Sequence, residues 1–285
     1  MRIGNLSGRL SLFTDAGAVD VEKASGSRFG SDPQAVYEVW DEFVAWASKA
    51  LANPTDLEAA EYRPEDLGAP TPAPAQIFAI GLNYTEHAKE SNFDVPTTFP
   101  PTFTKFRTSV SGPVTTVTIP TGGNVDWEVE LVAVIGRRAE RVTAADAWSH
   151  VAGLSAGQDI SERITQLSGP APQFSLGKSF PGFAPIGPWV VTVDEFADPD
   201  DLELQCAIDG ETVQHGRTRD FVFNVPALIQ GLSRVTPLLP GDVIFCGTPS
   251  GVGQGRTPKR FLRAGEVLVS RVEGIGELRQ TFSDE

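Results

Sequence analysis

The hydrophobic pattern of the N-terminal part of the chain predicts a small α+β unit. Residues 3–22 alternate loosely between apolar and polar, which is typical of a β-hairpin. An Asp-Pro helix start and apolar residues at helical spacing then predict an amphipathic helix over residues 33–51. The proline-rich stretch 68–74 favours an extended connector. We therefore expect a domain boundary that separates residues 1–75 from residues 76–285.

The second unit has a different pattern, with short apolar runs separated by glycine-rich turns. Runs of this length, bounded by turn signals, are typical of buried or half-buried strands. Strands are predicted at 77–81, 125–136, 202–208, 243–246 and 267–272, and helices at 143–151 and from Asn224 to about Val235. Many strands and few helices predict a β-dominated α+β fold.

The strand predicted at 125–136 carries three acidic residues, Asp126, Glu128 and Glu130, on one face. Because side chains alternate along a strand, the opposite face is entirely apolar and must be buried. Two carboxylates about 5 Å apart repel by roughly 3 kcal/mol at an effective dielectric constant of about 20. Either one of them holds a proton or a cation lies between them. A solvated edge strand is the alternative, but it leaves the strongly apolar flanking positions unexplained.

Composition narrows the kinds of partner. The formal net charge of −14 argues against a nucleic-acid backbone or an anionic membrane surface. We find neither a signal-peptide pattern nor a long apolar stretch, and the two cysteines lie in apolar runs, so a cytoplasmic protein with reduced thiols is expected. With only three histidines, a zinc site is disfavoured. A carboxylate site selects Mg²⁺ or Mn²⁺, with Ca²⁺ as an alternative.

A third carboxylate for this cation is available at Asp159. If the segment that follows is helical, Arg163 and Gln166 share its face and bring a cation and an amide next to the metal. The alternative for Asp159 is a helix N-cap, since Glu162 three residues later fits a capping box.

Two further segments have side chains or backbone groups suited to binding. Lys178 lies between apolar residues, where a lysine is usually a core-edge residue with its ammonium in water. Beside a carboxylate–metal cluster it is suited instead to a substrate carboxylate or a developing oxyanion. The loop from Gly247 to Gly253 allows close backbone approach, with Thr248 as a donor, but alone it is a weak signal because it has no phosphate-loop lysine.

His87 and Glu90 are three residues apart, so one helical turn places them in hydrogen-bond contact. A carboxylate on one imidazole nitrogen makes the other more basic, as the deprotonation of water near neutral pH requires. An exposed loop histidine is the alternative.

Five motifs, taken in order, resemble the fumarylacetoacetate hydrolase family. They are Gly-Leu-Asn-Tyr-x-x-His-Ala-x-Glu, Asp-Trp-Glu-Val-Glu-Leu, Gln-Asp-x-Ser-x-Arg-x-x-Gln, Leu-Gly-Lys-Ser-Phe and Gly-Thr-Pro-Ser-Gly-Val-Gly, and they fall within residues 77–276. The resemblance implies a β-roll preceded by a small, variable N-terminal domain. It also implies a homodimer and a role in aromatic or sugar catabolism.

The resemblance also implies roles for individual residues. Glu128, Glu130 and Asp159 would be ligands of Mg²⁺ or Mn²⁺, with Asp126 behind them. His87 and Glu90 would activate water, and Lys178 would stabilise an enolate. Substrate contacts would come from Arg163, Gln166, Gly247 and Thr248.

The implied activity is hydrolysis of a C–C bond in a 2,4-diketo acid, such as an acylpyruvate or fumarylpyruvate, to pyruvate and a second carboxylic acid. The family also contains β-keto-acid decarboxylases, such as those acting on oxaloacetate, and enol–keto isomerases. His87 and Glu90 favour hydrolysis, because decarboxylation needs no attacking water. A non-catalytic metabolite-binding protein is disfavoured because the implied metal ligands and the water-activating pair are all present. The motifs leave open the group attached to the 4-carbonyl.

Overall fold

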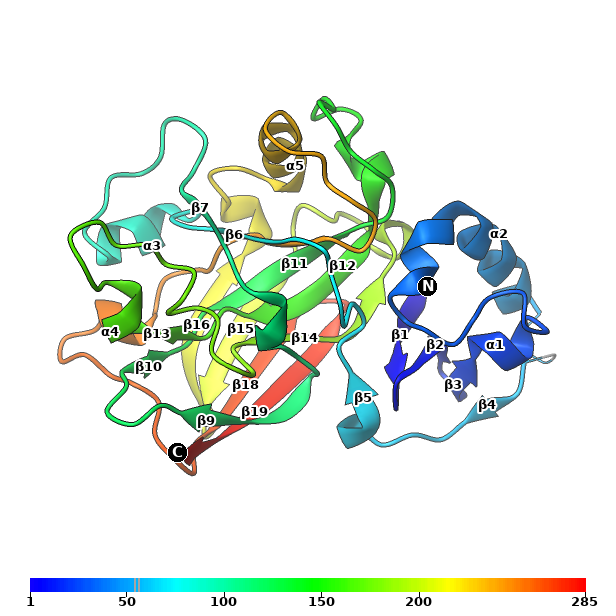
Figure 1. The fold of residues 1–285 in the computed structure, drawn as a ribbon, viewed down its shortest axis with the longest axis horizontal. Helices are drawn as coiled ribbons and strands as arrows, with labels where there is room; N and C mark the ends of the chain where they lie inside the picture. Colours follow the sequence, from blue (N-terminus) through cyan, green and yellow to red (C-terminus); the bar gives the residue numbers. More distant parts are fainter. Residues whose placement is uncertain (54, 56) are drawn as a thin grey trace.

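The computed structural model describes residues 1–53, 55 and 57–285. A 12-stranded mixed sheet runs through it in the order β4-β3-β2-β1-β14-β12-β11-β17-β6-β7, with β5 beside β1 and β8 beside β14. A second sheet has the order β16-β15-β18-β19-β9, and β10 and β13 form a separate pair. Among the described residues, no helix is long and apolar enough to cross a membrane. The sheets confirm the β-dominated α+β prediction (Figure 1).

The strands of the larger sheet come from both ends of the chain. They are β1 (Arg2–Leu6), β2 (Arg9–Thr14), β3 (Gly17–Asp20), β4 (Ala59–Ala60), β5 (Leu67–Gly68), β6 (Ile77–Ile80), β7 (Thr102–Thr104), β8 (Val110–Ser111), β11 (Val129–Ile135), β12 (Val151–Gln158), β14 (Ala184–Val191) and β17 (Val243–Phe245). The predicted N-terminal hairpin is thus a three-stranded unit whose first strand pairs with β14. The N-terminal segment therefore extends the main sheet.

The remaining strands lie mainly in the C-terminal half. They are β9 (Val114–Ile119), β10 (Val125–Asp126), β13 (Ser161–Glu162), β15 (Glu203–Ile208), β16 (Glu211–Arg217), β18 (Val267–Val272) and β19 (Gly276–Asp284). The predicted strands at 202–208, 243–246 and 267–272 are confirmed to within a residue. A hairpin turn at Asp209-Gly210, both with positive φ, connects β15 and β16.

The α-helices are short, and two predicted helices were too long. The observed α-helices are α1 (Val21–Ala24), α2 (Trp40–Leu51), α3 (Thr85–Glu90), α4 (Arg163–Gln166) and α5 (Val225–Ser233). The helix predicted at 33–51 begins as a 3₁₀ turn at Ala35–Val39 and becomes α-helical only at Trp40. The segment 143–151 contains only a 3₁₀ turn, Ala147–His150. Asn224 caps α5 by accepting from the Ala227 N–H, as predicted.

Strand β11 is buried on both faces, which explains its continuous apolar run. Leu131, Ala133 and Ile135 belong to a core cluster shared with the second sheet. Val132 and Val134 belong to a second cluster, which includes the aromatic side chains of α2. Because adjacent strand residues point to opposite faces, one strand supplies both cores.

The prediction of a single strand over residues 125–136 was wrong at Trp127 and Glu128. There the chain passes from β10 to β11, and β10 pairs with β13. Side-chain amides replace the ladder at the junction, since the Glu128 N–H donates to Gln158 Oε1 and the Val129 N–H to Gln214 Oε1. The break orients Asp126 separately from the two glutamates.

Candidate active site

Three buried carboxylates meet where β11 begins and β12 ends. Because these strands are antiparallel with Val129 opposite Gln158, the adjacent residues Glu128 and Asp159 are neighbours. The Asp159 N–H donates to the Glu128 carbonyl at 2.9 Å. Glu130 follows two residues along β11, on the same face. One oxygen from each carboxylate lies within 4.8 Å of the other two, which is close enough for one cation to contact all three.

Two lysines and an arginine balance most of this negative charge. Lys178 Nζ bridges Glu128 Oε2 at 2.7 Å and Asp159 Oδ2 at 2.6 Å. Lys105 Nζ contacts the other oxygen of Asp159. Although burial alone would raise it, the charges of Lys178 and Arg163 hold the pKa of Glu128 well below its ordinary value. Glu128 is therefore a stable anion inside the protein.

Glu130 pairs with no cation in the described part of the chain. Its carboxylate accepts a hydrogen bond from the Gly247 N–H at 2.7 Å and makes no ion pair with any described residue. Burial, together with the charges of Asp159 and Glu128, raises its pKa well above the ordinary value. A divalent cation among the three carboxylates would relieve that repulsion, and carboxylate oxygens suit Mg²⁺ and Mn²⁺. The donor set therefore fits such an ion.

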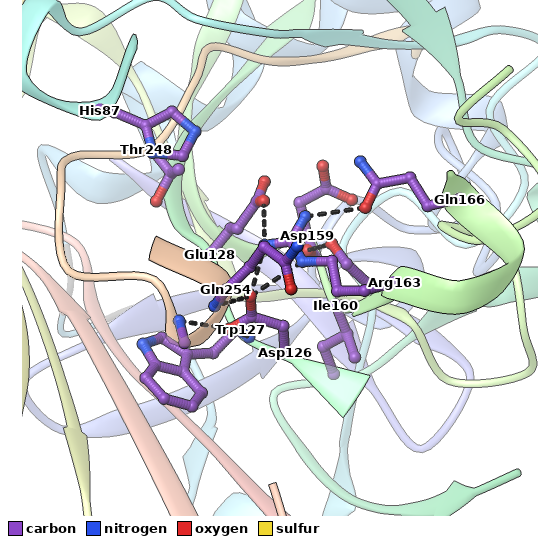
Figure 2. A network of polar contacts seen from close by, with 12 residues as sticks. His87, Asp126, Trp127, Glu128, Asp159, Ile160, Arg163, Gln166, Thr248 and Gln254 are labelled. Carbon is purple, nitrogen blue, oxygen red and sulfur yellow. Dashed lines mark hydrogen bonds and ion pairs between the residues drawn. The ribbon is translucent and has the colours of Figure 1, made fainter. Parts of the chain in front are cut away.

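Asp126 lies beside Arg163 and fixes its guanidinium group (Figure 2). It accepts from the Arg163 side chain and from the backbone N–H groups of Trp127, Gly253 and Gln254. Arg163 also donates to Glu128 Oε1 at 2.7 Å and to Gln166 Oε1 at 2.8 Å. Arg163 is thus held by protein carboxylates, whereas the Gln166 amide N–H₂ makes no hydrogen bond with described residues.

The two alternatives for the segment around Asp159 are resolved by α4. Asp159 precedes this short helix and shares no helical face with Arg163 and Gln166. Glu162 is the N-cap, accepting from the N–H groups of Ile164 and Thr165. The capping-box reading of Asp159 was therefore wrong, because β13 separates it from the helix.

His87 and Glu90 form the predicted contact on α3. His87 Nδ1 lies 2.8 Å from Glu90 Oε1, and Glu90 Oε2 accepts from the Gly251 N–H at 2.9 Å. Anchored at both oxygens, Glu90 fixes the imidazole, and with the proton on Nδ1 the second ring nitrogen is a free base. His87 is buried, so the exposed-loop alternative was wrong.

A cavity of about 380 Å³ brings these groups together. Most of the predicted site residues line it: His87, Glu90, Glu128, Glu130, Arg163, Gln166, Lys178 and Thr248. Apolar side chains form much of the remaining wall, including the edge-on pair Phe103 and Phe174. The cavity is thus polar at the carboxylates and largely apolar elsewhere.

The predicted Gly247–Thr248 loop supports the site more than it faces the cavity. The Gly247 N–H is used by Glu130. The Thr248 hydroxyl donates to the Val129 carbonyl and accepts from Gln214. These bonds fix the β11 backbone beside the triad.

Lys105 was missed by the sequence analysis. It follows β7 and reaches Asp159, 54 positions along the chain. Its ammonium is fully buried, and its contact with Asp159 leaves that carboxylate with a lysine on each oxygen. A lysine between phenylalanines, in Phe103-Thr-Lys-Phe106, was the available signal.

Known proteins resemble the part of the chain that contains the site. The family described as "Fumarylacetoacetate (FAA) hydrolase C-terminal" matches residues 76–283. Human mitochondrial oxaloacetate tautomerase FAHD2A is 42% identical over 73% of this chain, and the match spans 66% of the human protein. The 2,4-didehydro-3-deoxy-L-rhamnonate hydrolase of Sphingomonas sp. (strain SKA58) is 40% identical over 84% of both chains.

Solved structures extend the likeness to the whole chain. A provisionally named HpcE protein from Mycobacterium smegmatis is 55% identical, with a TM-score of 0.94 over 100% of this chain and 99% of that one. Maleylpyruvate hydrolase from Sphingobium sp. SYK-6, solved with manganese(II) and pyruvate, is 26% identical, with a TM-score of 0.82 over 100% and 99%. The chain therefore belongs to the fumarylacetoacetate hydrolase family, whose members are hydrolases, isomerases and tautomerases.

Proposed function

We propose that this protein is a divalent-metal-dependent hydrolase that cleaves a C–C bond of a 2,4-diketo acid to give pyruvate and a second carboxylic acid. The observation that carries the proposal is that the buried His87, paired with Glu90, lines the same cavity as Glu128 and Glu130 of the carboxylate triad. A general base next to a cation site suits attack by water on a carbonyl. The family membership and the two hydrolase relatives support the reading.

In this proposal Glu128, Glu130 and Asp159 hold Mg²⁺ or Mn²⁺. When bound, such an ion supplies a Lewis acid that polarises a substrate oxygen. The manganese(II) and pyruvate in the related maleylpyruvate hydrolase support a metal of this kind and a small keto acid as ligand. Lys105 and Lys178 each contact one oxygen of Asp159 and fix its orientation.

The proposed step uses His87 as general base. The unprotonated ring nitrogen takes a proton from water, whose oxygen bonds to C4 of the substrate while Glu90 holds the ring. The C3–C4 bond then breaks, its electron pair moves toward the 2-carbonyl to form the pyruvate enolate, and the imidazolium returns a proton to C3. Lys178, whose pKa is raised by Asp159 and Glu128 although burial alone would lower it, remains a cation beside the developing charge.

Oxaloacetate tautomerisation or decarboxylation is the second candidate, favoured by the 42% identity to the human tautomerase. The measurement that separates the candidates is pyruvate release from acetylpyruvate, fumarylpyruvate and oxaloacetate with Mg²⁺ or Mn²⁺, alongside the ultraviolet signal of oxaloacetate enol. We expect efficient cleavage of a diketo acid. Rapid enol–keto conversion of oxaloacetate with no diketo-acid cleavage would reject the hydrolase.

We expect residues 83–95 to act as a lid. This segment contains α3, and its Phe93 side chain is half exposed and yet lines the cavity. Closing over substrate would exclude water and hold His87 at the reacting carbon. Backbone amides of 83–95 should exchange hydrogen more slowly with Mn²⁺ and oxalate than with Mn²⁺ alone, while those of β11 stay unchanged. Full protection without ligand, unaltered by oxalate, would contradict a lid.

A homodimer, a cytoplasmic location, the division at residue 75 and the roles of the individual site residues stay predictions. Each follows from the sequence pattern or from the family resemblance.

A further inference from the structure

Among the residues that the structure describes, Lys259 is a cation of the active-site cavity that pairs with no protein carboxylate. Lys178 and Arg163 both contact Glu128, so neither is free. Lys259 also lines the cavity, and its ammonium makes no hydrogen bond or ion pair with the described residues. It is exposed, and it also borders an open surface hollow of about 690 Å³, which places it at the cavity mouth.

Lys259 belongs to a basic segment, residues 256–263, in a chain of net charge −14. Arg256, Lys259, Arg260 and Arg263 all border the outer hollow, and Glu266 is the one acidic residue among its described lining residues. Arg260 pairs with that carboxylate at 3.1 Å. The segment is therefore a local region of positive charge that attracts small anions.

The segment is also anchored, so Lys259 is presented from a defined position. The guanidinium groups of Arg256 and Arg260 lie 5.6 and 5.3 Å from the centre of the fully buried Trp127 ring. Arg256 donates to the carbonyls of Val213 and Gly251. Two of the four basic side chains thus hold the segment against the core next to Asp126, and Lys259 is left for a ligand.

Much of the cavity wall apart from the catalytic groups is apolar. Phe93, Phe103, Leu167, Phe174 and Val252 face the same space. Such a wall suits the carbon arm of a substrate, and among the described lining residues Lys259 is the cation available to a charge on that arm. We infer that Lys259 is a specificity-determining residue that binds a second, distal carboxylate. The inference rests on the proposed function, and with it the substrate class becomes dicarboxylic 2,4-diketo acids of the fumarylpyruvate type.

The test compares two inert 2-oxo acids of equal length, 2-oxoadipate and 2-oxohexanoate, which differ in a terminal carboxylate or methyl group. Their dissociation constants are measured by calorimetry on the Mn²⁺-loaded protein. We expect the parent to prefer 2-oxoadipate by about 10-fold, the scale of a charge-assisted hydrogen bond. Lys259→Gln should remove most of this preference and leave 2-oxohexanoate binding unchanged.

Arg263→Gln is the matched control, because Arg263 is an exposed cation of the same segment that borders only outer hollows. It should retain the preference. An unselective parent, a preference that survives in Lys259→Gln, or equal losses in both variants would overturn the inference. Because neither probe has a 4-carbonyl, the result is independent of cleavage. Selective binding with no pyruvate released from any diketo acid would reject the hydrolase and retain the role of Lys259.

Discussion

Glu130→Gln is expected to abolish the stabilisation of the protein by Mn²⁺ without weakening the metal-free fold. The glutamine carbonyl can still accept from the Gly247 N–H, which is the hydrogen bond that Glu130 makes. The substitution also replaces a carboxyl group whose ionised form is disfavoured by burial and by the charges of Asp159 and Glu128. The metal-free variant should therefore unfold at a temperature no lower than the parent.

Added Mn²⁺ should raise the unfolding temperature of the parent but not that of Glu130→Gln. A ligand at 100 times its Kd stabilises the folded state by about 2.7 kcal/mol, and the parent should show a shift of this order. Loss of an outer-shell contact already lowers metal affinity by roughly 10- to 100-fold, so loss of a ligand should cost at least as much. Differential scanning calorimetry with and without Mn²⁺ measures both quantities.

Glu90→Gln is the control, because Glu90 lines the same cavity but lies outside the triad. It should retain the Mn²⁺ shift in full. If Glu130→Gln binds Mn²⁺ as tightly as the parent, the carboxylate triad is not the metal site. If the metal-free Glu130→Gln variant is strongly destabilised, the Glu130 carboxylate supports the fold through more than its hydrogen bond to Gly247.

Strand alternation predicted the centre of the site because it depends on local geometry alone. Glu128 and Glu130 are two residues apart, so they face one way along an extended chain, and the apolar residue between them, Val129, requires burial. The His87–Glu90 contact was predictable for the same reason, since a single helical turn fixes it. Alternation failed for Asp126, because the strand is interrupted after it. The backbone N–H groups of Glu128 and Val129 donate to side chains of β12 and β16, Gln158 and Gln214, instead of to a neighbouring strand's backbone.

Contacts between residues far apart in the chain had no comparable signal in the sequence. Lys105 reaches Asp159 through the pairing of β6 with β7 and the course of β12, and no spacing in the sequence encodes that contact. The pairing of β1 with β14 joins residues nearly 190 positions apart. The helix predicted at 33–51 started late for a different reason: the pattern marks the buried face, but it does not distinguish a 3₁₀ turn from an α-helix.

His87→Ala is expected to lower diketo-acid cleavage by roughly 10²- to 10⁴-fold, the usual range for a positioned general base. Mn²⁺ binding should hardly change, because the imidazole pairs with Glu90 and lies outside the triad. Any oxaloacetate decarboxylation should be reduced less, since it needs no attacking water. Cleavage, decarboxylation and Mn²⁺ affinity are to be measured on one preparation of the variant.

The comparison of the two reactions decides the role of His87. A loss confined to cleavage is the expected result for a base that activates water. Equal losses of cleavage and decarboxylation with intact Mn²⁺ binding would mean that His87 acts in substrate binding or lid closure, which its position on α3 within residues 83–95 also permits.

Glu90→Gln distinguishes these outcomes further. If Glu90 serves only to orient and polarise the imidazole, its substitution should reproduce the same selective loss at a smaller magnitude. Undiminished cleavage in His87→Ala would remove the histidine from the mechanism.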